Sequence, residues 1–554
     1  MNKNLLTIAI LAVTQGAFAQ QPPSAGGQLL QIPPVSTPPR LAPELRIEQR
    51  TAAPAPGAEQ VKVVVRELRV SGATVFPAID LLALTGFQPG SELTLAQLQG
   101  MAARITEHYR SHGYFVAQAY VPAQEIKDNV VTIAVTEGRY GTVTLRNETN
   151  LSDRVARGPL EGLNSGDVIE NRPLEQRLLL LSDVPGVNVK STLVPGSIPG
   201  TSDLLVDVTP GQRVTGSIEA DNAGSRYTGE YRVGATVNLN NAAGLGDVAS
   251  LRALTSGSGL KYARASYQLP VGRAQVGVAY SLLDYSLGRE FASLQAHGTA
   301  RIASVFASYP LVRSRNNNTY LLLAYDAKKF QDKLDSIPSV TDRKSRVVTV
   351  GIHGERLDNL GGGGVNLYSV SLAIGDLDLQ TPAARAIDAQ TARTNGRFNK
   401  LSFSGAREQR LGGPFSAQLS INGQVASKNL DISEKMELGG MNAVRAYPEG
   451  EAYADEGVVL SLEGRMVLPK LSPQMPGQMQ LVAFVDAGAV TVNKDPWAPG
   501  SNTRHLSGAG VGINWAAPGN FLVRASYAHK LGNAAATSAP DRSGRFWVHL
   551  AKYF

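Results

Sequence analysis

Residues 457–469 read GVVLSLEGRMVLP, the clearest alternating segment of the chain. Successive side chains of a β-strand point to opposite faces, so every second residue shares a face. One face then carries Val458, Leu460, Leu462, Gly464, Met466 and Leu468, and the other carries Ser461, Glu463 and Arg465. Such a strand fits a soluble sheet with its polar face in water. It also fits a membrane barrel with its apolar face in lipid and its polar face lining a lumen.

Similar alternating segments follow one another from Gly211 to the C-terminus. They start near 215, 231, 247, 259, 274, 298, 319, 346, 364, 397, 415, 457, 479, 505, 521 and 546. The spacing of roughly 21 residues suits a spanning strand of about 10 residues with its connection, and an even number suits a closed bacterial barrel. The last strand, FWVHLAKYF, ends on Phe554. We therefore predict a 16-stranded antiparallel transmembrane β-barrel over residues 212–554, with a soluble all-β fold as the alternative.

The N-terminus has the features of an export signal. Lys3 precedes an apolar run over residues 5–13, and Ala17-Phe18-Ala19 has the small-x-small pattern of a cleavage site. The run is too short for a transmembrane helix, which needs about 18 apolar residues or more. We expect a signal peptide over residues 1–19, cleaved between Ala19 and Gln20.

Residues 20–60 contain nine prolines, a composition typical of an extended tether. Within it, only 26–31 and 43–50 could form a turn or two of helix. At residue 61 the pattern changes, and a strand, two helices and two strands follow up to residue 139, with a break in the first strand near Glu67 that suggests a bulge. A second unit of the same order occupies 140–211, with a helix that we expect Asn171 to cap. The chain thus has two β-α-α-β-β units before the barrel.

Composition argues against several functional classes. The net charge is +7, from 53 basic and 46 acidic residues, and no basic run of the kind used on nucleic acid is present. The chain has no cysteine, so thiolate metal sites are excluded. His108 and His112 have a spacing that can hold a metal ion, but without a third ligand two exposed histidines are the simpler interpretation. We find no catalytic motif and expect neither an enzyme nor a cofactor.

One connection, residues 429–456, is unusually long. Its second half lies within 441–457, MNAVRAYPEGEAYADEG, which is acidic apart from Arg445. If the two N-terminal units lie in the periplasm, every odd-numbered strand ends outside, and this loop between strands 11 and 12 is external. Long loops without regular structure usually have a function.

Strand 13, MQLVAFVDAGAV, offers Arg445 a partner. Alternation turns Phe484, Asp486 and Gly488 toward the lumen, with Asp486 roughly 20 Å up the wall at ~3.4 Å per residue. A carboxylate there needs a cation, and Gly488 leaves room for another segment. If the loop folds back into the lumen, the planar guanidinium of Arg445 can bind Asp486 through two hydrogen bonds. Spacing alone equally allows Asp486 to face lumen water or a wall arginine such as Arg465.

These features together resemble the two-partner secretion transporters, the haemolysin and filamentous-haemagglutinin secretion/activation proteins of the superfamily that carries polypeptide-transport-associated (POTRA) domains. The likeness covers nearly the whole mature chain. Its most specific part is the loop motif Val444-Arg445-x-Tyr447 together with Phe484-x-Asp486-x-Gly488. In that family the loop enters the barrel and its arginine pairs with the strand aspartate. Ala446 departs from the usual glycine, so the local turn is expected to differ.

The resemblance implies an outer-membrane pore, with its N-terminal domains in the periplasm, that exports a large unfolded partner protein without nucleotide hydrolysis. The POTRA domains would capture the partner's N-terminal secretion domain, and the strand ending in Phe554 would be the signal read by the barrel-assembly machinery. Membrane lipid is a further expected partner, and nucleic acid is not. Family members often carry an N-terminal helix that plugs the pore, and here the prolines allow only a short one. An outer-membrane assembly insertase and a passive porin are the alternatives.

Overall fold

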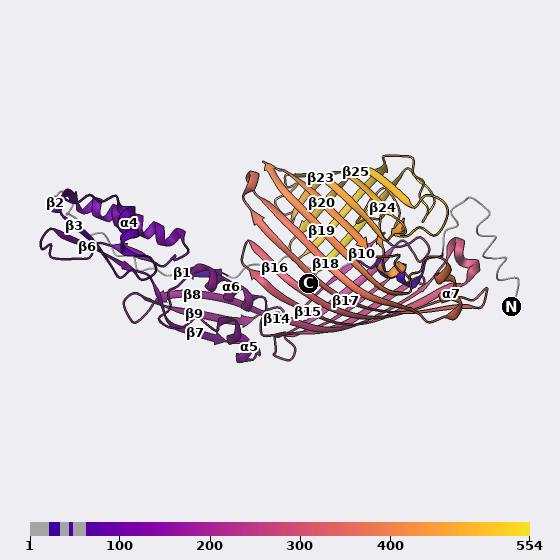
Figure 1. Cartoon of the computed structure of the whole chain (residues 1–554), viewed down its shortest axis with the longest axis horizontal. Helices are drawn as coiled ribbons and strands as arrows, with labels where there is room; N and C mark the ends of the chain where they lie inside the picture. The colour runs from indigo at the N-terminus through magenta and orange to yellow at the C-terminus, as the bar shows by residue number, and fades with distance from the viewer. Residues whose placement is uncertain (1–21, 34–43, 48–61) are drawn as a thin grey trace.

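The computed structural model describes residues 22–33, 44–47 and 62–554. The predicted signal peptide, with its cleavage site at Ala19 and Gln20, lies outside these residues. The molecule is elongated, with two small α/β units in a row at one end and a large barrel at the other (Figure 1).

The barrel is closed and contains sixteen strands in sequence order, each antiparallel to its neighbours, with the last strand paired to the first. This confirms the predicted fold class. The strands are β10 (Val214–Asp221), β11 (Arg232–Asn240), β12 (Val248–Thr255), β13 (Leu260–Val271), β14 (Ala274–Ser286), β15 (Ala296–Arg313), β16 (Asn317–Leu334), β17 (Ser339–Asp358), β18 (Gly364–Leu379), β19 (Gly396–Gly412), β20 (Phe415–Ala426), β23 (Glu456–Val467), β24 (Gln478–Thr491), β25 (Thr503–Ala517), β26 (Phe521–Lys530) and β27 (Gly544–Tyr553).

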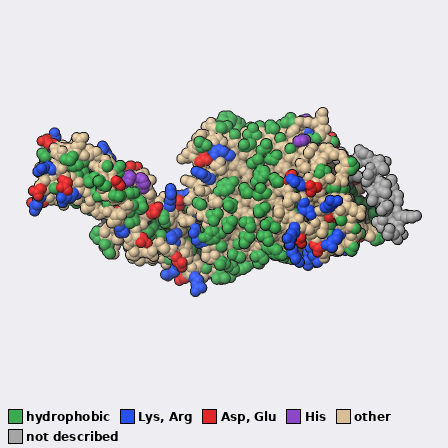
Figure 2. All heavy atoms as spheres, in the orientation of Figure 1, with side chains coloured by type: hydrophobic (Ala, Val, Ile, Leu, Met, Phe, Trp, Pro, Cys, Tyr) green, Lys and Arg blue, Asp and Glu red, His purple; other side chains and the backbone are tan. Residues whose placement is uncertain are grey.

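The outer face of the barrel carries a band of apolar side chains (Figure 2). Residues that alternation assigns to this face, such as Leu460, Leu462 and Val485, are between 43% and 54% exposed. Their inward neighbours on β24, Phe484 and Asp486, are buried. The wall therefore has the apolar-out, polar-in arrangement of a membrane barrel. In the part of the chain that the structure describes, no helix is long and apolar enough to cross a membrane.

The first N-terminal unit packs its helices on a small sheet. Its elements are β2 (Lys62–Val65), β3 (Glu67–Ser71), α3 (Ala78–Thr85), β4 (Ser91–Thr94), α4 (Leu95–Ser111), β5 (Gln118–Tyr120) and β6 (Val130–Thr136). Helix α4 begins with a capping box between Thr94 and Gln97 and buries Ile105 and Tyr109. The bulge predicted near Glu67 was wrong: the chain changes sheets there, because β2 pairs with β4 whereas β3 pairs with β6.

The second unit repeats this plan with β7 (Arg139–Asn147), α5 (Asp153–Arg157), the 3-10 helix η1 (Gly158–Leu160), α6 (Asn171–Ser182), β8 (Val187–Pro195) and β9 (Thr201–Pro210). Helix α6 has Glu170 at its N-cap, so the prediction that Asn171 caps it was wrong by one residue. Part of the tether joins the sheet of this unit. Residues Glu44–Ile47 form β1, which pairs in parallel with β8, whereas the sequence had allowed a turn or two of helix at 43–50.

The second unit contacts the near end of the barrel. Arg313, at the end of β15, binds Asp183 with Nε to Oδ2 at 2.7 Å and Nη2 to Oδ1 at 2.9 Å. The Asn241 side chain, in the turn after β11, donates to Asn150 Oδ1 at 2.9 Å. Strand β10 begins a few residues after β9, so the first barrel strand runs away from this unit.

Two segments occupy the inside of the barrel. One is the short helix α2 (Ala25–Leu30), which forms within the Pro-rich segment where a short helix was considered possible. The other is the long loop between β20 and β23, which contains the 3-10 helix η4 (Ile432–Glu434) and the two-residue strands β21 (Met436–Glu437) and β22 (Tyr453–Ala454). The remaining connections carry η2 (Arg289–Leu294), η3 (Leu360–Gly362) and α7 (Pro382–Gln390).

Candidate functional site: the loop inside the barrel

Arg445 and Asp486 are in direct contact. The Arg445 guanidinium donates from Nε to Asp486 Oδ2 at 2.8 Å and from Nη2 to Oδ1 at 2.7 Å. The backbone N–H of Arg445 also donates to Asp486 Oδ2, at 3.1 Å. The carboxylate is 0% exposed and the arginine side chain 13%. The planar guanidinium and the carboxylate thus form a bidentate salt bridge, with two parallel N–H···O hydrogen bonds.

Three further groups hold the arginine. Its Nη1 donates to Glu463 at 2.8 Å, and its Nη2 donates to the hydroxyl of Ser461 at 2.9 Å. Its Cζ lies 3.4 Å from the centre of the Phe484 ring, a cation–π contact. Burial alone lowers the pKa of an arginine, but the hydrogen bonds and charges of Asp486 and Glu463 raise the pKa of Arg445 above its ordinary value. The cation is therefore held charged inside the lumen.

Arg465 does not bind Asp486. Its Nη1 pairs with Glu408 at 2.9 Å, and its Nη2 pairs with Glu463 at 2.6 Å. The alternative in which Asp486 pairs with the wall arginine Arg465 is therefore wrong. Arg465 instead helps to balance the charge of Glu463, the second carboxylate of the site.

The residues on either side of Arg445 are packed against the wall. Val444, Ala446 and Tyr447 are each 0% exposed. The Tyr447 hydroxyl donates to the carbonyl oxygen of Ala534 at 3.1 Å. The indole N–H of Trp547, on β27, donates to the carbonyl oxygen of Arg445 at 2.7 Å. The whole motif is thus bound to the wall, and not its arginine alone.

Glycines on the wall make room for the motif. A Cβ on Gly508 would lie 2.5 Å from the Cβ of Ala446, and one on Gly488 would lie 2.4 Å from a Leu438 methyl group. Ala446 is not among the described residues with positive φ, so alanine is accepted there without backbone strain. The methyl group of Ala446 fits because β25 carries no side chain opposite it.

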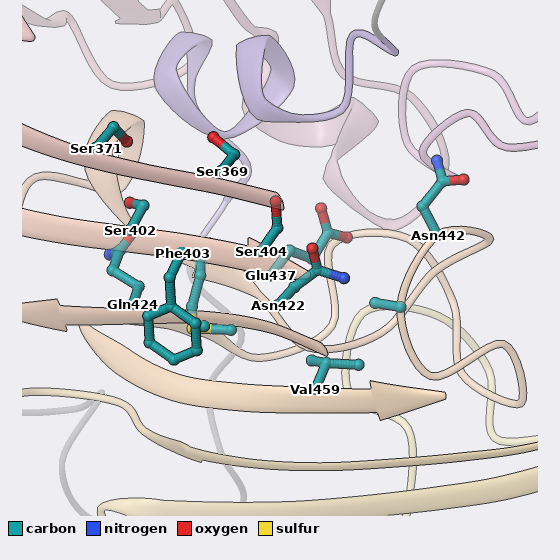
Figure 3. Close-up of a pocket in the computed structure, with 13 residues that line it drawn as sticks. Ser369, Ser371, Ser402, Phe403, Ser404, Asn422, Gln424, Glu437, Asn442 and Val459 are labelled. Atoms are coloured by element: carbon teal, nitrogen blue, oxygen red, sulfur yellow. The ribbon is translucent and has the colours of Figure 1, made fainter. Parts of the chain in front are cut away.

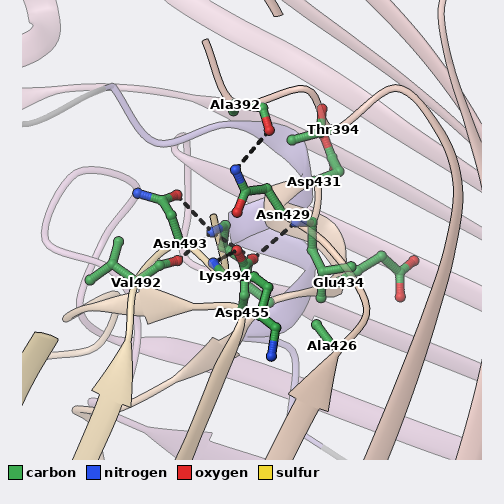
Figure 4. Close-up of polar contacts among 12 residues, drawn as sticks. Ala392, Thr394, Ala426, Asn429, Asp431, Glu434, Asp455, Val492, Asn493 and Lys494 are labelled. Carbon is green, nitrogen blue, oxygen red and sulfur yellow. Dashed lines mark hydrogen bonds and ion pairs between the residues drawn. The ribbon is translucent and has the colours of Figure 1, made fainter. Parts of the chain in front are cut away.

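Asn429 and Asp455 anchor the two ends of the loop (Figure 4). Asp455 accepts hydrogen bonds from the backbone N–H of Leu430 at 3.0 Å and of Lys494 at 2.8 Å, and pairs with Lys435 at 2.7 Å. Asn429 donates to the carbonyl oxygen of Ala392 at 2.8 Å. It also donates to the carbonyl oxygen of Asp495 at 2.8 Å. The contacts with Lys494 and Asp495 join the start and end of the loop to the connection that follows β24.

Other loop carboxylates meet cations of the wall. Glu434 pairs with Lys328 at 2.6 Å and with Lys400 at 2.9 Å. Glu451, which is 0% exposed, pairs with Arg504 at 2.7 Å. A buried carboxylate is stable only with such partners. The acidic composition of the loop therefore matches the basic side chains that the barrel turns inward.

Helix α2 lies between the loop and the wall. Its first N–H, at Ala25, donates to Asp332 at 2.8 Å, and the Gln31 side chain donates to the Tyr453 hydroxyl at 2.8 Å. Arg232 donates to the carbonyl oxygen of Gln31 at 2.6 Å. A Cβ on Gly26 would lie 3.0 Å from the Ile432 side chain, so the helix approaches the loop closely.

The wall next to the loop carries neutral polar groups. A cavity of about 360 Å³ opens there, lined by Ser369, Ser371, Ser402, Ser404, Asn422 and Gln424 on β18, β19 and β20, and by Glu437 and Asn442 of the loop (Figure 3). Hydroxyl and amide groups can exchange hydrogen bonds with a peptide backbone without holding a fixed charge. This surface suits contact with an extended chain of varied sequence.

Sequence reasoning reached Arg445, Asp486 and the flanking motif residues but missed several partners. Alternation placed Ser461 and Glu463 inward without showing that they touch Arg445. Nothing in the spacing pointed to Trp547 or Gly508, because β27 and β25 come beside the motif only when the barrel closes. Phe554 follows β27 and pairs its backbone with Gly216, N–H to O at 3.1 Å.

The two histidines considered as metal ligands lie in the first N-terminal unit, His108 on α4 and His112 at the C-cap of that helix. Their rings are 4.2 Å apart at the centroids, and Phe76 packs against both. Within the described ranges, no group of three or more His, Cys, Asp or Glu side chains is arranged to hold a metal ion.

Comparison with protein families gives two matches. The model described as "Haemolysin secretion/activation protein ShlB/FhaC/HecB" matches residues 200–515, and "POTRA domain, ShlB-type" matches residues 63–138. The heme/hemopexin transporter protein HuxB of Haemophilus influenzae is 31% identical over 474 residues, covering 84% of this chain and 82% of that protein. The outer membrane transporter CdiB of Dickeya dadantii is 25% identical, covering 81% and 79%.

Solved structures show the same architecture. CdiB from Escherichia coli superposes with a TM-score of 0.69 at 22% identity, covering 91% of this chain and 93% of that one. BamA from Haemophilus ducreyi lacking POTRA domains 1–3 gives a TM-score of 0.54 at 16% identity, covering 89% and 100%. At these identities the likeness concerns the fold alone.

Proposed function

The chain belongs to the haemolysin secretion/activation protein family, ShlB/FhaC/HecB, and on this premise we propose how it exports a partner protein across the outer membrane. The barrel spans that membrane, and the two N-terminal units lie in the periplasm as POTRA domains. The partner is a large protein that passes through the barrel unfolded, as an extended chain. No step uses nucleotide hydrolysis, and folding of the partner outside the cell supplies direction.

The POTRA domains capture the secretion domain of the partner by adding one of its strands to a sheet edge. Strand β8 supports this proposal, because its outer edge already pairs with a segment of the tether: β1 pairs with it from Glu44 opposite Lys190 to Ile47 opposite Leu193. A four-residue strand offers few backbone hydrogen bonds, so a longer strand of the partner can compete with it. Capture would then displace part of the tether.

The contact between Arg445 and Asp486 carries the second part of the proposal. We assign these residues as the lock that holds the loop of residues 429–456 inside the barrel, with Val444, Ala446 and Tyr447 packing the loop and Phe484 and Gly488 shaping the wall. The exported chain passes along the neutral wall of β18, β19 and β20. The lock keeps the loop beside this wall, where it bounds the path of the exported chain.

Two further partners belong to the proposal. The terminal strand β27, with Phe554 after it, is the segment that the barrel-assembly machinery recognises, because it closes the barrel against β10. Lipid covers the apolar band of the wall.

An outer-membrane assembly insertase is the second candidate, since the fold also resembles BamA. A passive porin fits less well, because the lumen holds both α2 and the loop and two periplasmic units precede the barrel. The insertase and the exporter differ in their product: one leaves barrels in the membrane and the other releases protein outside.

Deletion of residues 61–139, the first POTRA domain, tests the proposal. We expect a heat-modifiable barrel in the membrane at normal level and no secreted partner. Deletion of 382–390, the helix α7 of an external connection, is the control and should leave secretion intact. Secretion at normal level without residues 61–139 would contradict a capture role of the first POTRA domain and would leave β8 of the second domain as the capture edge. Loss of other outer-membrane barrels, with secretion intact, would favour the insertase.

A further inference from the structure

Basic side chains gather on the outer wall just beyond the apolar band. Arg301 on β15, Lys329 on β16, and Lys344 and Arg346 on β17 are all exposed. Figure 2 shows such residues at the end of the barrel far from the POTRA domains. Alternation places them on the same face as Val305, Tyr325 and Val348, which belong to the band and are between 40% and 51% exposed. We call the four residues the basic patch.

The register of the strands brings like charges together. Arg301 lies directly opposite Lys329, and Lys329 lies directly opposite Lys344. Side chains at such paired positions on one face have Cβ atoms about 5 Å apart, and like charges there destabilise a sheet. A row of three cations across adjacent strands is therefore unfavourable unless an anion binds it.

The protein does not supply that anion. Among the described residues, no carboxylate forms an ion pair with Arg301, Lys329, Lys344 or Arg346, and Lys344 donates to the Gln380 amide at 2.8 Å. Carboxylates do lie nearby, at Asp376 opposite Arg346 and Asp378 opposite Lys344, and at Asp342, which accepts a hydrogen bond from the Gln331 amide at 2.8 Å. Asp378 is engaged by Arg385 at 2.7 Å. The row of three cations thus keeps its positive charge.

A cavity adjoins the patch on the side of β13 and β14. Its volume is about 300 Å³, and its lining includes Lys261, Leu282, Asp284, Thr299 and Arg301, so one carboxylate faces it beside the two cations. Toward the middle of the barrel the outward residues of β15 and β17 are apolar, as at Val305 and Val348, whereas at the basic patch they are charged. A ligand that fits this surface has acyl chains and, directly next to them, phosphate groups.

We propose that the basic patch binds the phosphate groups of a phosphorylated glycolipid of the outer leaflet, with its acyl chains along Val305, Tyr325 and Val348. The placement in the outer leaflet rests on the proposed orientation, with the POTRA domains in the periplasm. When two or three of these cations bind one phosphate, the attraction between each cation and the phosphate outweighs the repulsion between the cations. The bound lipid joins β15, β16 and β17 at the point where their cations would otherwise repel.

Native mass spectrometry of the purified full chain in neutral detergent tests this site. The probes are lipid A bearing two phosphates, lipid A with its phosphates removed, phosphatidylglycerol and inorganic phosphate. The test variant is Arg301→Gln/Lys329→Gln/Lys344→Gln. The control is Arg273→Gln/Arg410→Gln/Lys470→Gln, which removes the same charge from exposed residues at the other end of the barrel. Heat-modifiable migration verifies that both variants are folded.

We expect the wild-type protein and the control to retain phosphorylated lipid A, and the test variant to bind it at least tenfold more weakly. Dephosphorylated lipid A should bind the wild-type protein as weakly as phosphorylated lipid A binds the variant. Equal retention by all three proteins would overturn the proposal. So would preference for phosphatidylglycerol, or binding of inorganic phosphate that lipid A does not displace. The assay contains no partner protein, so its failure would leave the export function standing.

Discussion

At the scale of single residues, Arg445 shows what alternation in a sequence can and cannot predict. A strand's period of two residues placed Asp486 on the lumen face, and chain length allowed the loop to reach it. The Phe484 ring was placed on the same face, but its position under the guanidinium depends on rotamers. Glu463 lies opposite Phe484 on the neighbouring strand β23, but its contact with Arg445 depends on where the loop lies in the lumen, and no local pattern records that position.

Gly508→Ala should weaken secretion, because the new methyl group would lie 2.5 Å from the Cβ of Ala446 and push the loop off the wall. Adding Ala446→Gly removes that clash and should restore most of the activity. The measurement is secreted partner per transporter in the membrane. Gly464→Ala on β23 is the matched control, since its Cβ would meet nothing within 4 Å. A normal level of secretion in Gly508→Ala alone would show that the loop does not need this close contact.

At the scale of elements, the spanning strands were predictable because lipid demands an apolar side chain at every second position. The ends of the strands were less so. Strand β17 begins at Ser339, before the predicted start near 346, because beyond the apolar band its outward side chains become polar and the alternation fades. The sequence allowed a short helix at the positions of both β1 and α2, and only α2 is a helix, for a different reason. Both are short and are stabilised by tertiary partners, the sheet of the second POTRA domain and the barrel lumen.

Glu137 follows β6 at the end of the first POTRA domain and should control the stability of the loop after β3. It lies between β6 and β7, is 4% exposed, and accepts hydrogen bonds from the backbone N–H of Thr74 at 2.6 Å and of Val75 at 2.7 Å. Glu137→Gln replaces a charged acceptor by a neutral one and should reduce the local stability by about 1–3 kcal/mol. Hydrogen exchange at the Thr74 and Val75 amides in the full chain should become faster. Glu92→Gln, at an exposed position of β4, is the control.

The same contact should depend on pH. Burial alone raises the pKa of Glu137, but the hydrogen bonds from Thr74, Val75 and Tyr109 outweigh it and hold the pKa below its ordinary value. A carboxyl whose pKa is lowered on folding adds stability above its unfolded pKa, about 4.3, and loses it as the pH falls through the folded value. The protection lost in Glu137→Gln should therefore be constant near neutral pH and vanish in acid. A difference that persists below the folded pKa would show that the carboxylate charge is not its cause.

At the scale of the whole molecule, the lumen is filled by two segments that contact each other. Helix α2 meets the loop through Gln31 and Tyr453 and meets the wall through Asp332 and Arg232. Deletion of residues 22–33 should therefore raise the conductance of the barrel in planar lipid bilayers, because the helix no longer fills its part of the lumen. Deletion of 382–390 should leave conductance unchanged. Equal conductance with and without residues 22–33 would mean that α2 does not obstruct the pore.

The central claim is that export requires the loop to be held in the lumen by the pair of Arg445 and Asp486. Breaking a buried pair strands one charge and costs about 3–5 kcal/mol, whereas an exposed pair contributes about 0–1 kcal/mol. Because Asp486 is 0% exposed, the free energy lost on breaking this pair should lie near the range for buried pairs. We expect a strong reduction in secretion for Arg445→Ala and for Asp486→Ala, with little loss of barrel from the membrane. Arg445→Lys should retain part of the wild-type secretion, because an ammonium group cannot form the two parallel hydrogen bonds of a planar guanidinium.

The most direct test is the double-mutant cycle, measured as secreted partner per transporter in the wild-type protein, Arg445→Ala, Asp486→Ala and the double variant. If the two residues act as one lock, the double variant should be little worse than either single variant. Losses that add in the double variant would show that Arg445 and Asp486 act separately, and would contradict the account.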